Sequence, residues 1–274
     1  MAIDLAKKYS GLVDETFTSE SKSSLVVNND YDFVGAKSIA IYSVGTAELN
    51  DYGRNTEGTS RYGVAKDLAT EIQEVQMEMD KSFTFVIDKA DEDETVGALN
   101  AGTALARQIN EVVIPYADKY VYGKMVAGAG TTATETITSA NAYESLATGN
   151  AVQDEASVPE QGRIAVVNPT FYKNLKADEK AVLDCEAGQD MRSKGVVGEM
   201  DGVAIQKVPA RLLPENVNFI LAHPVATTFA SKLAEYKIHT DAPGVSGSLV
   251  EGRVYFTAFV RNNKKQAIYV SKSA

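Results

Sequence analysis

Residues 72–88 read IQEVQMEMDKSFTFVID, and this stretch decides how the rest of the chain is interpreted. Val75, Met77 and Met79 alternate with polar residues, and a run of aromatic and β-branched residues follows them. Alternation with a period of two is typical of a β-strand that has one face buried. The stretch therefore predicts a long strand region.

A second strand is predicted over residues 37–44, which read KSIAIYSV and place Ile39 and Ile41 on one face. Between the two strand regions, residues 45–71 contain four glycines and no apolar period. A loop of this length inside a compact domain is uncommon and is usually functional or mobile. We therefore predict a long two-stranded ribbon that projects from the body of the protein.

The loop of this ribbon holds the residues that we predict to form an interface between subunits. Tyrosine and arginine are enriched in protein interfaces, and this segment has no apolar pattern with which to bury itself. The alternative is a surface loop that binds nothing. The candidate interface residues are Tyr52, Arg54, Arg61, Tyr62 and Lys66.

A long helix is predicted over residues 96–127. The acidic residues at 91–94 precede it, where the helix dipole favours negative charge. Pro115 lies in the middle and is expected to kink or split the helix. Spacings of four, three, four and four trace one apolar face, formed by Leu105, Ile109, Val112, Tyr116 and Tyr120.

The rest of the chain mixes helices and strands without a regular βαβ repeat, which indicates an α+β fold. Helices are predicted over 140–154 and 170–183. Strands are predicted over 163–167, 219–222, 235–241, 253–260 and 264–270, with a hairpin that pairs 196–197 with 203–205.

Composition narrows the possible functions. The chain has 274 residues, 44% of them hydrophobic and 23% charged, which is ordinary for a folded globular protein. The formal net charge of −10 argues against a generic DNA-groove binder, since such proteins are normally basic. We find no secretory signal and no apolar run long enough to span a bilayer, so a soluble cytoplasmic product is expected.

No catalytic, cofactor-binding or metal-binding residue is predicted. Cys185 is the only cysteine, so neither an intrachain disulfide nor a cysteine zinc site can form. His223 and His239 have no metal-ligand spacing. The acids at 91–94 lack the pattern of an EF-hand loop, and we interpret them as a solvated helix start rather than a cation site. Residues 243–248 are not a Gly-x-Ser-x-Gly nucleophile motif.

The order of parts resembles that of the major capsid proteins of tailed phages, which have the Hong Kong 97 capsid fold. The segments that carry the resemblance are 82–89 (SFTFVIDK) with 98–100 (ALN), 142–144 (AYE) with 158–163 (VPEQGR) and 166–169 (VVNP), 198–203 (GEMDGV) with 208–209 (VP), and 222–224 (AHP) with 255–260 (YFTAFV).

The resemblance implies a division of the chain into five parts. These are an N-terminal arm at 1–36, an extended loop at 37–88, a peripheral domain with a spine helix at 89–161, an axial domain at 162–224, and return strands of the body at 225–274.

The resemblance also implies a function, which is structural rather than enzymatic and needs no cofactor. The subunit is expected to assemble through pentamers and hexamers into an icosahedral shell around double-stranded phage DNA, which it would contact weakly. The expected partners are other copies of itself, a separate scaffolding protein and a portal, with no membrane. The expected location is the virion, after synthesis in the cytoplasm of the bacterial host.

Two alternatives are kept beside the capsid interpretation. The first is an encapsulin-type shell protein, which would have the same fold and enclose a protein cargo. The second is a small-molecule enzyme whose site the sequence does not reveal.

Overall fold

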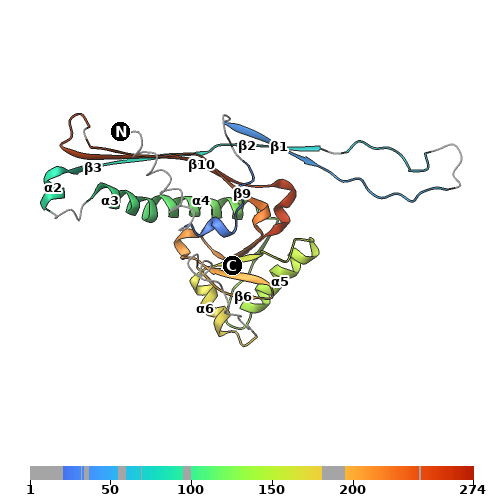
Figure 1. The fold of residues 1–274 in the computed structure, drawn as a ribbon. Coiled ribbons are helices and arrows are strands. Elements are labelled where there is room, and N and C mark those ends of the chain that lie inside the picture. Colours follow the sequence, from blue (N-terminus) through green and yellow to red (C-terminus); the bar gives the residue numbers. More distant parts are fainter. Residues whose placement is uncertain are drawn as a thin grey trace.

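The computed structural model describes residues 21–31, 33, 37–54, 60–68, 70–94, 100–180, 195–240 and 242–274. Cys185 and most of the predicted arm lie outside these residues. The described chain forms a projecting ribbon, an elongated body built on a three-stranded sheet, and a second body built on a six-stranded sheet (Figure 1).

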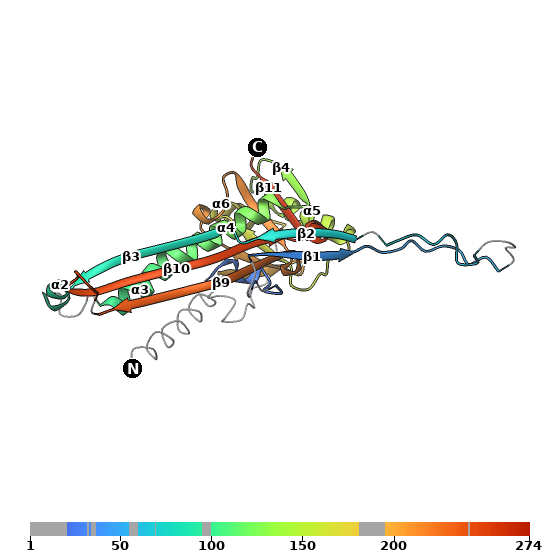
Figure 2. The same cartoon turned by 90° about the horizontal axis from the view of Figure 1, so that it is seen from above.

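The ribbon begins with β1 (Ser38–Val44), which pairs antiparallel with β2 (Thr70–Gln76). After β2 the chain enters β3 (Met79–Asp88), which belongs to a different sheet. The strand region predicted over 72–88 is therefore two strands. Figures 1 and 2 show the chain between β1 and β2 extending far beyond the rest of the molecule.

The elongated body is a sheet in the order β3-β10-β9, with a long helix packed along one face (Figure 2). The central strand β10 (Gly247–Val260) pairs antiparallel with β3 and with β9 (Thr227–His239). Alternate residues of β10, including Val250 and Val254, pack against helix residues such as Leu105. The opposite face of this sheet carries the charged residues described below.

The long helix is one continuous rod of three segments. They are α3 (Ala101–Gln108), the π-helical η2 (Ile109–Val113) and α4 (Ile114–Ala127). The Asn100 side chain caps the first segment by accepting a hydrogen bond of 2.8 Å from the Gly102 amide. Pro115 lies in the first turn of α4 and lacks an amide hydrogen, and the wider π-turn beside it lets the helix continue. The helix is thus neither split nor ended at Pro115.

The π-turn changes which residues face the sheet. Leu105 and Ile109 are buried, as the predicted face requires, but Val112 is 52% exposed and Tyr116 is 43% exposed. The prediction for these two residues was wrong, because a π-turn holds more residues than an α-turn and so rotates the face that follows it. The residues that face the core after the turn are Val113, Ile114, Ala117 and Val121.

The acidic residues at 91–94 do not begin this helix. They lie in α2 (Lys89–Glu94), a separate short helix that follows β3. The long helix is described from Ala101 onward, so the acids are not part of it, and Asp91 and Glu92 instead lie in the first turn of α2.

The second body is a sheet in the order β4-β11-β8-β5-β7-β6, sandwiched between helices. Its strands are β4 (Thr131–Thr134), β5 (Ile164–Val167), β6 (Val196–Met200), β7 (Val203–Lys207), β8 (Val217–Ala222) and β11 (Ile268–Lys272). One face packs on α5 (Ala142–Glu155) and α6 (Pro169–Ala177). The other face packs on α4, which is therefore shared by the two bodies.

Most predicted elements of this second body are present, with three differences. The short strand β4, which pairs parallel to β11, was not predicted. The last strand begins at Ile268, because residues 262–267 form the 3-10 turn η5 (Asn262–Ala267). Helix α6 ends at Ala177, where the next residue is extended, instead of running to 183.

Candidate subunit interface on the projecting ribbon

The base of the ribbon is held to the body by one of its two faces. Ile41 of β1 and Val75 of β2 are buried there, and they form a small core with Phe33, Met77 and Phe259. Since side chains alternate along a strand, the neighbouring residues point to the opposite face.

That opposite face is exposed and carries three large apolar side chains among polar ones. Tyr42 and Ile72 lie opposite each other in the register, and they are 67% and 55% exposed, while Val44 is 67% exposed. These three residues are not among the interface residues predicted from the sequence. Alternation in KSIAIYSV separates Tyr42 and Val44 from Ile39 and Ile41, but it does not say which of the two faces meets the body.

Farther out, the two sides of the loop contact each other. The Gly53 amide donates a 3.0 Å hydrogen bond to the Arg61 carbonyl. The rings of Tyr52 and Tyr62 pack edge to face with centroids 5.1 Å apart. Two of the five predicted interface residues are thus brought together. A tight turn over residues 60–63 follows, in which the Gly63 amide donates to the Ser60 carbonyl at 3.1 Å. Gly63 has a positive φ of 84°, which residues with side chains rarely adopt.

The other three candidates are cationic and exposed. Arg54, Arg61 and Lys66 form no ion pair with any of the described residues. Large apolar side chains near them, Leu49 and Val64, are also exposed. Exposed apolar side chains that form a contiguous patch are typical of interaction surfaces in soluble proteins. The described part of the loop therefore exposes both apolar and cationic side chains.

The joint between ribbon and body is fixed by polar contacts. Glu78, between β2 and β3, accepts hydrogen bonds from Lys124 Nζ at 2.9 Å and from the Tyr120 hydroxyl at 2.8 Å, both on α4. The hydrogen bond from Lys124 holds the pKa of the Glu78 carboxyl below its ordinary value, against the opposing effect of partial burial. This anchor is charged and lies at the surface.

A second set of polar contacts anchors β2. The Gln73 side chain donates to the Val260 carbonyl at 2.9 Å and accepts from the Asn262 amide at 3.0 Å. The Asn262 side chain also donates to Glu71 at 3.2 Å. The ribbon is therefore tied both to the long helix and to the end of β10.

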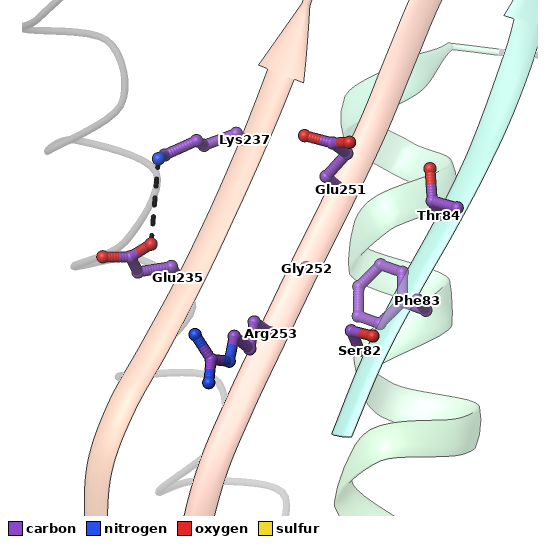
Figure 3. Close-up of a pocket in the computed structure, with 8 residues that line it drawn as sticks. All are labelled: Ser82, Phe83, Thr84, Glu235, Lys237, Glu251, Gly252 and Arg253. Carbon is purple, nitrogen blue, oxygen red and sulfur yellow. Dashed lines mark ion pairs between the residues drawn. The ribbon is translucent and has the colours of Figure 1, made fainter. Parts of the chain in front are cut away.

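A shallow hollow of about 400 Å³ lies on the face of the three-stranded sheet that turns away from the helix (Figure 3). Gly252 forms its centre, and a Phe83 ring from the neighbouring strand lies beside it. The remaining lining residues are Ser82, Thr84, Glu235, Lys237, Glu251 and Arg253.

The charged groups around this hollow are paired with one another. Arg253 donates to both carboxylate oxygens of Asp80, at 2.9 and 2.6 Å. Lys237 lies 3.7 Å from Glu235, as the dashed line in Figure 3 marks. His239 lies 3.2 Å from Glu251. This network is a solvated, charge-balanced sheet surface, and it presents no activated nucleophile.

The histidines occupy separate places and act locally. His223 Nδ1 accepts a hydrogen bond from the Val225 amide and Nε2 lies 3.1 Å from the Gln161 carbonyl, which fixes the turn before β9. Among the described residues, no three histidine, cysteine or acidic side chains gather in a way that could hold a metal ion. In the same part of the chain, no helix is both long and apolar enough to cross a membrane.

The fold matches solved phage capsid structures. No protein-family model and no curated protein matches the sequence. A structure from Mycobacterium phage Che8 superposes with a TM-score of 0.70 and 18% identity, over 92% of this chain and 90% of that one. The capsid of cyanophage P-SCSP1u superposes with a TM-score of 0.66 and 14% identity, over 91% of this chain and 86% of that one. A virus-like particle from Pyrococcus furiosus superposes with a TM-score of 0.58 and 12% identity, over 97% of this chain and 98% of that one. The chain thus has the α+β Hong Kong 97 capsid fold that the sequence predicted.

Proposed function

We propose that this protein is a major capsid protein, a structural subunit that assembles through pentamers and hexamers into an icosahedral shell around double-stranded phage DNA. The observation that carries the proposal is the ribbon. It extends away from its own body, exposes Tyr42, Val44 and Ile72 on one face, and carries exposed cations in its loop. Such a surface gains stability only from a neighbour, and the fold it stands on is shared with shells.

The two bodies support a division of labour within the subunit. We propose that the three-stranded sheet with the long helix is the peripheral domain and that the six-stranded sheet is the axial domain. This grouping by sheet differs from the boundaries predicted from the sequence. It places β4 and α5, which lie within 89–161, in the proposed axial domain, because β4 belongs to the six-stranded sheet and α5 packs on it. It assigns β11 to the axial body for the same reason.

The net charge of the subunit supports a shell whose wall binds packaged DNA only weakly. The net charge of −10 limits binding to the phosphate backbone of packaged DNA. The proposed partners are further copies of the chain, a separate scaffolding protein and a portal, and the proposed place of the mature protein is the virion. A structural rather than an enzymatic role is supported by the fold that the chain shares with solved capsids.

Electron microscopy of the purified protein tests the proposal. Wild-type protein should form closed shells or capsomers, whereas a small oligomer of constant size would contradict it. Deletion of residues 51–62 should leave a folded subunit that forms no shells. The deletion joins Asn50 to Gly63, and these residues already pack together, since a Cβ placed on Gly63 would lie 3.1 Å from the Asn50 side chain. Circular dichroism and a thermal midpoint check the fold of the variant.

An encapsulin-type shell is the second candidate, and the match to the Pyrococcus furiosus virus-like particle over nearly all of both chains favours keeping it. The contents of the shells separate the two. Nuclease-protected double-stranded DNA in particles purified from infected cells supports the capsid, and a co-purifying folded protein cargo supports the encapsulin.

A further inference from the structure

The body built on the six-stranded sheet has two ends that its topology keeps apart. Strands β5 and β7 pair parallel, so both begin at one end of the strand pair and finish at the other. Arg163 and Gly202 come directly before β5 and β7. Lys207 ends β7, and α6 follows β5 closely. Figures 1 and 2 accordingly show α5, which leads into β5, and α6 on opposite sides of this body.

The end at which β5 and β7 finish exposes positive charge. Lys173 and Lys176 of α6 and Lys207 of β7 are all exposed, and α6 contains no acidic residue. Lys207 Nζ lies 5.5 Å from the centroid of the Tyr172 ring, whose quadrupole attracts the ammonium group. Tyr172 lies one turn before Lys176 on the same helix, so these side chains share one surface. This surface, formed by Tyr172, Lys173, Lys176 and Lys207, is called the basic face here.

The opposite end exposes negative charge. A hollow of about 260 Å³ lies there, and three carboxylates line it, those of Asp154, Glu160 and Asp201. Glu155, the last residue of α5, is also exposed. Arg163 is the only cationic residue between positions 150 and 163. These four acidic residues are called the acidic face here.

Arg163 turns inward and holds the acidic face in shape. Its side chain is 2% exposed and donates to the Asp154 carboxylate at 2.6 Å. It also donates to the carbonyls of Val158 and Pro159, at 2.6 and 3.0 Å. These bonds fix the turn that carries Glu160. A surface that is ordered before binding loses less conformational entropy on association, so the acidic face is prepared for a partner.

We propose that the basic face of one subunit docks on the acidic face of a second copy. The inference rests on the proposed function, and it names the surfaces through which neighbouring six-stranded bodies meet within a ring of subunits. Charge favours a second copy as the occupant, because subunits with a net charge of −10 repel one another except where cations of one meet acids of the next. Two different surfaces on opposite sides of one body make a head-to-tail contact, which closes into a ring when the rotation between copies allows it.

Charge reversal in the full chain tests the inference. Lys173→Glu with Lys176→Glu reverses the basic face, and Glu155→Lys with Glu160→Lys reverses the acidic face. All four side chains are exposed, so both double variants should keep the wild-type thermal midpoint within about 2 °C. Each should need at least about tenfold more protein for half-maximal association at low salt, because like charges then face each other. Sedimentation velocity measures the association.

Recombining the reversals separates the contact from other effects. A quadruple variant with all four substitutions should associate like wild type, because opposite charges again face each other. An equimolar mixture of the two double variants should also associate, but only into rings with an even number of subunits, since copies of the same variant repel. Hexamers meet this condition and pentamers do not.

Arg107→Glu with Lys119→Glu is the matched control, because it changes the net charge as much as the basic-face reversal does, at exposed positions of the long helix. It should associate like wild type, and an equal loss in this control would ascribe the effect to net charge and overturn the inference. Wild-type association of either double variant, or no recovery in the quadruple variant, would overturn it too.

Two further outcomes are distinguishable. If the basic-face reversal abolished binding to a double-stranded DNA column and left association unchanged, the basic face would be assigned to nucleic acid and the inference would be overturned. A wild-type subunit that never associates would contradict the proposed function and the inference together. Normal shells from both double variants would overturn the inference alone.

Discussion

The carboxylate of Glu78 lies 2.7 Å from Nζ of Lys124, and this pair joins the foot of the ribbon to the middle of the molecule. Glu78 stands between β2 and β3, and Lys124 stands in the last turn of α4. The ribbon therefore leaves the body at a place where strand and helix are linked by charge as well as by packing.

This pair predicts a pH-dependent contribution to stability. Because the pKa of Glu78 is held below its ordinary value of 4.5 by the hydrogen bond from Lys124, the stabilisation is present above that value and is lost as the pH falls through the folded-state pKa. Lys124→Met should lower the free energy of unfolding at pH 7 by less than about 1 kcal/mol, since both side chains are partly exposed. The difference between variant and wild type should shrink at pH 3.

Thermal midpoints at the two pH values measure this effect. Lys119→Met, at an exposed position of the same helix, is the control and should show no such pH dependence. A Lys124→Met difference that is the same at pH 3 and pH 7 would contradict the role of the ion pair.

Glycine at position 252 is required by two aromatic rings. Gly252 lies opposite Phe83 on one side and Tyr236 on the other, and a Cβ atom there would collide with the Phe83 ring and lie 2.9 Å from Cδ1 of Tyr236. Gly252→Ala should therefore destabilise the protein by about 1–3 kcal/mol through overpacking. Gly123→Ala is the matched control, because a Cβ atom at that helical position meets nothing within 4 Å.

For this pair the two substitutions should move the thermal midpoint in opposite directions. Alanine in a helix interior is favoured over glycine by about 1 kcal/mol, so Gly123→Ala should raise it. A Gly252→Ala protein as stable as wild type would contradict this prediction, because it would show that the rings of Phe83 and Tyr236 can move aside without loss of stability.

The π-turn in the long helix predicts a specific pattern of core sensitivity. Leu105→Ala and Ile109→Ala should each cost about 2–5 kcal/mol, because both side chains are buried against the sheet. Val112→Ala should cost less than about 0.5 kcal/mol, as expected for an exposed position. Chemical denaturation of the three variants measures the differences. A regular α-helix through residue 112 would make Val112→Ala as damaging as Ile109→Ala.

Asp178 predicts a second pH dependence, in the body built on the six-stranded sheet. Its side chain accepts hydrogen bonds from the Tyr143 amide at 3.1 Å and the Lys180 amide at 3.1 Å, and so it caps α5 from another part of the chain. These backbone donors hold the pKa of Asp178 below its ordinary value of 3.8. The stabilisation is therefore complete above that value and is lost as the pH falls through the folded-state pKa. Asp178→Ala should lower the thermal midpoint at pH 6, and the gap to wild type should close toward pH 2.

The uncovered face of the ribbon predicts a separation of folding from assembly. Tyr42→Thr with Ile72→Thr keeps residues that favour strands and removes apolar contact area. The subunit should keep its thermal midpoint within about 1 °C, since exposed substitutions usually change stability little. Shell formation, followed by light scattering, should fall strongly. Glu74→Thr on the same face is the control, and normal shells from the double variant would exclude this face from the subunit interface.

The strands and helices were largely predictable because most of them carry a clear local period. Alternation in residues 72–88 indicated strands, and the sequence 198–202 indicated the hairpin between β6 and β7, although β6 continues to Met200 and the turn is shorter than predicted. The face of the long helix was predictable only up to Ile109. Beyond it, a π-turn rotates the face, and that turn depends on how the helix meets Pro115 and the sheet rather than on a local pattern.

The candidate interface was partly predictable for a similar reason. Residue type and the lack of a core pattern selected Tyr52 and Tyr62, which the structure brings together. Tyr42 and Ile72 were missed, because an alternating strand has two faces and only the tertiary structure decides which one is covered. Their pairing also joins residues on opposite sides of a long loop, which no short-range signal specifies.

The register of the three-stranded sheet has a consequence for biosynthesis. Met79 pairs with Phe256 and Asp88 pairs with Gly247, so β3 can pair only after a strand that lies far downstream in the sequence has been made. At translation rates of about 5–20 residues per second, that delay is on the order of ten seconds or more. During this time a nascent chain has its ribbon sequence but no body on which to seat it. The ribbon can therefore reach its final position only after β10 has been made, and subunits cannot associate through a seated ribbon before that point.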